Sequence, residues 1–310
     1  MAVSHAANFP VIQCYKSEVS PLKTREWLAF IGLALAWGSS FLWIKIALDE
    51  VGPFLLVAYR LLFGFLGLLI VLSIRRPSWP RDRHTWQVLI TLGLINTAIP
   101  FVLISWAELF IDSAVASILN GSVPLFTTVI AHFFIADDRL NSAKVLALFT
   151  GFVGVVTLLI RDLNGGFELN FLGHGAMLLA VIFYAIAAVY ARRGTGDIAP
   201  VLRALIPVAS ADAAIWLVTP LVESPITLPR LPLTWLALIW LGLIGSCIAY
   251  LLYYYLIHAI GPTRATMVTY TFPLIGVLLG VVFLDELLDG NLILGGAMVL
   301  ASIVTVNRKK

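Results

Sequence analysis

Two ionisable side chains lie inside long apolar stretches of the sequence, where a charge is costly. Asp212 lies near the middle of 201–222, and Arg60 lies within 53–74. Such groups cost about 2.5–3.5 kcal/mol on membrane-insertion scales and usually face a cavity. Asp212 could carry a proton or bind an amine, and Arg60 could hold a carboxylate or phosphate with its two-pronged guanidinium. The alternatives are a hydrogen-bonded structural aspartate and an arginine that extends to the membrane surface.

Uncharged polar residues and aromatic residues form a second set of candidates at similar depth. Hydrogen-bonding groups at one depth could bind a solute, and aromatic rings there could enclose an amphipathic one or stack on a cation. Contacts between helices are the alternative for each of them. Together with the two ionisable groups, the candidate substrate-binding residues are Trp37, Arg60, Asn96, Asn120, Tyr184, Asp212, Tyr250 and Tyr270.

The sequence contains no pattern typical of catalysis or of a metal centre. There is no Gly-x-Ser-x-Gly, no His-Glu-x-x-His and no phosphate-binding glycine loop, and the five histidines are scattered. We therefore expect no catalytic residue, no metal ligand, no cofactor and no nucleic acid partner.

The composition indicates that lipid surrounds much of the chain. Sixty per cent of the residues are apolar and 12% are charged, whereas soluble domains carry about 25% charged residues. A single core cannot bury so much apolar surface, so membrane lipid is an expected partner.

Part of the sequence returns at an offset of 149 residues. Eight of the eleven residues in 85–95 are identical in 234–244, without a gap, and the same offset places Pro124 on Pro273. An internal duplication in a strongly apolar chain is typical of membrane transporters built from two related halves.

Ten apolar stretches are long enough, or nearly so, to cross a membrane as helices. They are 27–47, 53–74, 85–106, 114–135, 143–160, 172–191, 201–222, 235–257, 264–284 and 290–306. If the N-terminus is cytoplasmic, sixteen Lys and Arg residues fall on the cytoplasmic side and only Lys45, Arg161 and Arg230 fall outside. The excess of positive charge on the inner side predicts that both termini are cytoplasmic, in a plasma membrane that would be the inner membrane of a bacterium.

The predicted organisation has four parts. These are a disordered cytoplasmic tail (1–26), a five-helix repeat (27–160), a second five-helix repeat (172–306) and a basic cytoplasmic C-terminus (307–310). Because five is odd, the second repeat enters the membrane from the opposite face. The predicted fold is therefore an all-α integral membrane protein in which two inverted five-helix repeats surround a central cavity.

Four prolines are predicted to interrupt the third, fourth, seventh and ninth helices, namely Pro100, Pro124, Pro207 and Pro273. Because Pro124 and Pro273 are repeat partners, paired bends at these two positions could gate the cavity. Static curvature is the alternative.

Several short motifs follow one another along the chain, and the last two kinds occur in both halves. They are Trp37-Gly38-Ser39-Ser40, Ala58-Tyr59-Arg60, the small-residue runs from Ser113 to Pro124 and from Thr263 to Pro273, and the acidic residues Asp138 and Glu286 that follow those runs. In these residues the chain resembles the drug/metabolite transporter superfamily, and within it the EamA family of ten-helix carriers, over about residues 27–306. The sequence differs at Phe183-Tyr184, where the family usually has Trp-Ala, and at Asp138, where it has Glu.

The resemblance implies a secondary transporter that exports or exchanges small metabolites by alternating access about a midplane cavity. With the mixed polar and aromatic midplane, it favours amino acids or similarly amphipathic solutes. A carrier similar to lipid-linked-sugar flippases, a channel and a polytopic membrane enzyme stay open as alternatives. Small residues also recur every four positions in the fifth helix (Ala143, Ala147, Gly151) and the tenth (Ala297, Ala301, Thr305). They allow close packing within the chain or in a homodimer through helices five and ten.

Overall fold

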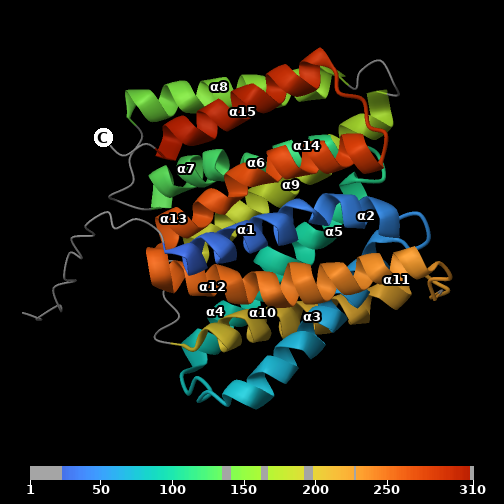
Figure 1. Cartoon of the computed structure of the whole chain (residues 1–310), viewed down its shortest axis with the longest axis vertical. Coiled ribbons are helices and arrows are strands. Elements are labelled where there is room, and N and C mark those ends of the chain that lie inside the picture. The colour runs from blue at the N-terminus through green and yellow to red at the C-terminus, as the bar shows by residue number, and fades with distance from the viewer. Residues whose placement is uncertain (1–22, 135–140, 162–166, 192–197, 227, 308–310) are drawn as a thin grey trace, which may run out of the picture.

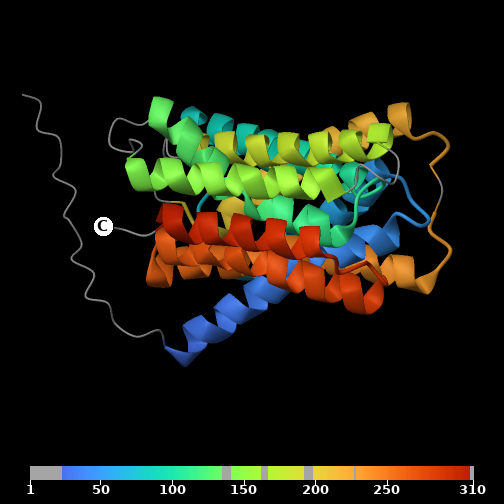
Figure 2. The same cartoon turned by 90° about the horizontal axis from the view of Figure 1, so that it is seen from above.

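The computed structural model describes residues 23–134, 141–161, 167–191, 198–226 and 228–307. These residues form helices joined by turns and loops, without a strand among them. Most of the helices run side by side along one common direction, while the first helix (blue) lies obliquely to the others in Figure 2 (Figures 1 and 2). Most of the predicted tail, Asp138 and residues 308–310 lie outside the described residues.

Within the described ranges, ten helical crossings follow one another along the chain, and several of them consist of two or three segments. The crossings are α1 (Thr24–Gly38) with α2 (Ser40–Ala47); α3 (Pro53–Arg75); α4 (Arg83–Gly93), η1 (Leu94–Ala98) and α5 (Ile99–Ala107); α6 (Ser113–Gly121) with α7 (Val123–Phe134); α8 (Ser142–Arg161); α9 (Phe167–Ala191); α10 (Pro200–Val222); α11 (Pro232–Ile239), η3 (Trp240–Ile248) and α12 (Ala249–Ile260); α13 (Pro262–Thr266), η4 (Met267–Thr271) and α14 (Phe272–Phe283); and α15 (Gly290–Asn307). Among the described residues, nine crossings are long and apolar enough to span a membrane, and Gly290–Thr305 is a shorter apolar helix. The predicted all-α membrane fold is confirmed.

Corresponding crossings of the two halves run in opposite directions. In Figure 1 the crossing from α4 to α5 runs from left to right, whereas its repeat partner, from α11 to α12, runs from right to left. α1 begins and α15 ends at the left. We call this the terminal end of the bundle and the opposite one the distal end.

Repeat-related glycines bring the two halves into close contact. A Cβ atom on Gly93 would lie 3.0 Å from the Cα of Pro207 in α10, and a Cβ atom on Gly242 would lie 2.8 Å from the backbone oxygen of Arg60 in α3. Each of these helices therefore crosses a helix of the other half at a position that has no room for a side chain.

The third and eighth crossings both widen into a π-helix, η1 and η3, at the same position of the repeat. π-helical turns are rare and are frequent at functional sites. In η1 the widening precedes Pro100, which lacks the N–H needed for a regular α-helical bond.

The fourth and ninth crossings are interrupted directly before the paired prolines, as predicted. Pro124 is the second residue of α7 and Pro273 is the second residue of α14, a position where a missing N–H costs little. The prediction for Pro207 is wrong, because α10 continues through it. Proline leaves the carbonyl four residues earlier without its helical partner, and the Tyr254 hydroxyl donates to that carbonyl, on Arg203, at 3.3 Å.

Large apolar side chains cover the outside of the bundle. Ile74, Leu217 and Leu221 are 74%, 75% and 83% exposed, as expected where lipid is the solvent. α8 and α15 form an outer pair (Figure 1), and a Cβ atom on Gly154 would lie 2.8 Å from the oxygen of Gly295. The fifth and tenth helices therefore pack against each other within the chain.

Candidate functional site

Arg60, on α3, is the charged residue around which both halves of the chain meet. Only 4% of its surface is exposed. Its Nε donates a hydrogen bond to Ser246 Oγ at 3.2 Å, and its guanidinium carbon lies 3.8 Å from the centre of the Phe101 ring. The Tyr184 and Tyr250 side chains lie close enough to interact with it electrostatically. Residues from α3, α5, α9, η3 and α12 therefore surround one buried cation.

Trp37, on α1, adds an aromatic wall beside this cation. Its Nε1 donates to the backbone oxygen of Gly245 at 3.0 Å. The ring centres of Tyr250, Tyr253 and Phe272 lie 5.9, 5.3 and 6.0 Å from that of Trp37. We define the Arg60 cluster as Trp37, Arg60, Phe101, Tyr184, Ser246 and Tyr250.

Two members of the Arg60 cluster, Phe101 and Ser246, were missed by the sequence analysis. The repeat offset of 149 residues places Phe101 on Tyr250 and Thr97 on Ser246. Thr97 lies close to the Tyr250 hydroxyl, and Ser246 accepts a hydrogen bond from Arg60. Extending the repeat alignment by two helical turns would have identified both residues.

The other four predicted binding residues occupy separate positions. Asp212 is 8% exposed and lies close to the Trp216 side chain, while its Oδ1 has no hydrogen-bond partner among the described residues. Asn96 lies half-buried in η1, and Asn120 near the end of α6 has a buried Oδ1 with no partner in the described part of the chain. The Tyr270 hydroxyl donates to a backbone carbonyl of α15 at 3.5 Å. The contacts thus join Trp37, Arg60, Tyr184 and Tyr250 and leave these four apart.

The two predicted gating prolines lie near a common contact. Pro273 packs against the end of α6, where a Cβ atom on Gly121 would lie 3.0 Å from Pro273 Cγ. Gly121 is three residues before Pro124, so the interruptions of the fourth and ninth crossings adjoin each other.

Three carboxylates join the two halves at the distal end, and we call them the distal carboxylates. Each accepts backbone N–H bonds at the start of a helix from the other half, where such groups lack helical partners. The bonds are Phe54 N and Leu55 N to Glu223 (both 2.9 Å), Ser113 N and Ala114 N to Glu286 (2.7 and 2.9 Å), and Arg230 N and Leu231 N to Glu50 (3.1 and 2.9 Å).

Glu50 makes one further bond, accepted from Thr234 Oγ1 at 2.6 Å. This hydrogen bond, and then the one from the Leu231 amide, lower the pKa of Glu50 below its ordinary value. A lowered pKa means that the carboxylate keeps its bonds above the ordinary value and loses them only as the pH falls through the lowered one. Glu50 therefore holds α11 throughout the neutral range.

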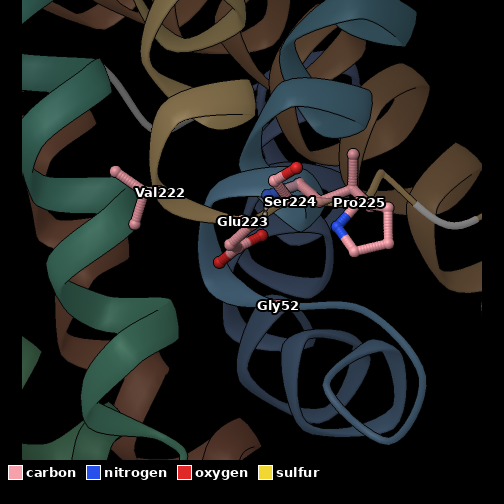
Figure 3. A pocket seen from close by; sticks show the side chains of 6 residues that line it. Gly52, Val222, Glu223, Ser224 and Pro225 are labelled. Carbon is pink, nitrogen blue, oxygen red and sulfur yellow. Dashed lines mark hydrogen bonds between the residues drawn. The ribbon is translucent and has the colours of Figure 1, made fainter.

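A hollow of about 280 Å³ lies beside Glu223 at the distal end, lined by Gly52, Leu55, Val222, Glu223, Ser224 and Pro225 (Figure 3). It is not at the Arg60 cluster. The Glu223 carboxylate is directed toward the turn at Gly52 and already accepts hydrogen bonds from two backbone amides of α3. The hollow therefore belongs to the contact between the halves.

Glu108 is a second buried ionisable residue, which the sequence analysis missed because it follows the apolar stretch of the third helix. It is fully buried, and neither carboxylate oxygen has a hydrogen-bond partner among the described residues. Lys45 donates to the backbone oxygens of Glu108 and Ile111, the latter at 3.0 Å. A cation is favourable at the end of a helix, where carbonyls lack partners.

Comparison with known proteins identifies relatives over nearly the whole chain. The model of the EamA-like transporter family matches twice, over residues 24–160 and 171–308. The uncharacterized transporter YoaV of Bacillus subtilis is 23% identical over 292 residues, which cover 91% of this chain and 98% of that protein. The uncharacterized inner membrane transporter YedA of Escherichia coli K12 is 28% identical over 256 residues, 81% of this chain and 80% of that one. A solved structure titled "Crystal structure of protein" shares the fold, with a TM-score of 0.63 and 20% identity over 92% of this chain and 98% of its own.

Proposed function

Because the chain belongs to the EamA-like transporter family, we propose that it is a secondary transporter that exports or exchanges small amphipathic metabolites, with amino acids first among them. The observation that carries the proposal is the Arg60 cluster itself. A buried cation and an aromatic wall lie where α1, α3 and α5 of the first half meet α9, η3 and α12 of the second. Polar groups at interrupted helices between inverted repeats are the usual setting of a transporter's solute site.

The distal carboxylates support alternating access. They tie helices of one half to helices of the other at the distal end, so this end corresponds to a closed gate. We propose that the terminal end is cytoplasmic and that the solute reaches the Arg60 cluster from there. Breaking the distal contacts would then open the other side.

The test is counterflow in liposomes that contain the purified protein. We expect saturable uptake of a labelled amino acid or related metabolite, accelerated when the same solute is present inside. Uptake that does not saturate and shows no acceleration would indicate a channel, and chemical change of the solute would indicate an enzyme. Movement of labelled lipid alone would indicate a flippase.

Asp212→Asn should abolish transport driven by a proton gradient while the protein stays folded. The buried carboxylate has one oxygen without a partner among the described residues, so it can bind and release a proton, which the amide cannot. Proton-driven uptake and size-exclusion profiles measure the two effects. Asp285→Asn is the matched control, because Asp285 is exposed and its left-handed backbone also suits asparagine. Full gradient-driven uptake by the Asp212 variant would rule out this coupling role.

A further inference from the structure

We infer that Arg60 binds the carboxylate of an organic solute whose apolar or aromatic body lies along Trp37 and Tyr250. This inference deepens the proposed transport function and rests on it. It names the charge and the class of the solute, neither of which follows from the fold.

The first step of the argument is that the Arg60 charge is incompletely paired. Arg60 uses Nε to bind Ser246 and lays its face over Phe101. Its two terminal amino groups form no hydrogen bond and no ion pair with any described residue. Among the carboxyl groups of the described residues, only that of Glu108 is close enough to influence Arg60, and Glu108 interacts more strongly with Lys45. Burying a cation in this way costs free energy unless an anion binds to it.

The second step concerns the surroundings of the Arg60 terminal amino groups. A Cβ atom on Gly245 would lie 3.8 Å from an amino nitrogen of Arg60 and 3.4 Å from Ser40 Oγ. Because Gly245 has no side chain, the position between the guanidinium and Ser40 of α2, where a Cβ atom would just fit, is not filled by this residue. Trp37 binds the oxygen of the same glycine, so the aromatic wall begins directly beside this position.

The third step concerns the charge of the solute. At the repeat offset, Arg60 coincides with Ala209, so the cluster carries this positive charge in one half only. One guanidinium with two parallel donors matches a planar carboxylate of charge −1. A phosphate dianion would leave one negative charge uncompensated among aromatic rings.

The fourth step concerns the body of the solute. Trp37, Tyr184 and Tyr250 are only partly buried although helices of both halves surround them. Their flat faces suit an aromatic or branched apolar group, and the indole N–H of Trp37 already donates to the oxygen of Gly245.

The test uses a matched set of probes with the purified full-length protein. Phenylpropionate and phenylalanine carry the carboxylate, phenylalaninamide and phenethylamine lack it, and inorganic phosphate supplies a different anion. We expect saturable binding of both carboxylates by calorimetry or tryptophan fluorescence. We expect about tenfold weaker binding of phenylpropionate by Arg60→Lys, which keeps the charge without the paired donors, and none by Arg60→Gln. Arg75→Gln, on the exposed end of the same helix, should bind as the wild type does.

The probe series keeps the inference testable even if the Arg60 variants do not fold. Equal affinity of the wild type for phenethylamine and phenylpropionate, tighter binding of phosphate, or no saturable binding of either carboxylate at millimolar concentration would overturn it. Unchanged binding by a folded Arg60→Lys would do the same. If Arg60 bound carboxylates but the protein showed no counterflow in liposomes, the proposed transport function would be refuted and the binding site would still be supported. Counterflow that does not depend on a carboxylate would refute only the inference.

Discussion

Valine in place of Gly242 should destabilise the protein more than any surface substitution, by about 3 kcal/mol, the upper end of the usual cost of overpacking. A Cβ atom at this position would meet Phe63 Cβ and the backbone of Arg60 and Gly64, the latter two at 2.8 and 3.1 Å. Backbone atoms cannot turn aside as a flexible side chain can, so η3 and α3 would have to separate. Thermal unfolding of the detergent-purified protein measures the loss.

The same substitution should weaken solute binding, because the Arg60 carbonyl is one of the atoms displaced. Gly93→Val should cause a similar loss of stability at the repeat-related crossing, where Pro207 and Ser210 occupy the space. Gly175→Ala is the control, since nothing lies within 4 Å of a Cβ atom there and alanine favours a helix. If Gly242→Val unfolded at the wild-type temperature, the close crossing of the two halves would be wrong.

The sequence predicted the crossings well because hydropathy and length alone determine them. The tenth span was expected over 290–306, and α15 covers Gly290–Asn307. The repeat also predicted the interruptions at Pro124 and Pro273. It did not predict the break between α1 and α2, where Gly38 packs against Ile275. A Cβ atom on Gly38 would lie 2.8 Å from Ile275 Cβ. At that break the chain contacts a helix more than two hundred residues later in the sequence, and the local sequence does not reveal such a contact.

The candidate site was predicted only in part for the same reason. Arg60 and Trp37 stand out in a sequence because a charge or an indole inside an apolar stretch is unusual. Ser246 and Phe101 are ordinary in such stretches and gain importance only from Arg60, 186 residues away from Ser246 along the chain. Glu108 was overlooked because a carboxylate at a helix end normally reaches water, whereas this one is enclosed.

The double variant Glu223→Gln/Glu286→Gln, which alters two of the three distal carboxylates, should open the distal end of the bundle more often than the wild type does. Glutamine keeps one acceptor oxygen, so each helix start loses one of two N–H bonds and its favourable negative charge. Helix-cap substitutions cost about 1 kcal/mol each. Two would shift the ratio of distal-open to distal-closed molecules about 30-fold, since 1.4 kcal/mol corresponds to a factor of ten.

The reporter is a cysteine in place of Leu55, which is 3% exposed and lines the distal hollow. A membrane-impermeant thiol reagent should label it about 30-fold faster in the double variant, with the modified residue identified by mass spectrometry so that Cys14 and Cys247 need not be removed. Glu26→Gln is the matched control, because Glu26 caps its own helix, α1, at the terminal end. Since the remaining distal carboxylate, Glu50, keeps its bonds at neutral pH, the variant should stay folded and open more often. Equal labelling of wild type and double variant would mean that these carboxylates cap helices without holding the gate closed.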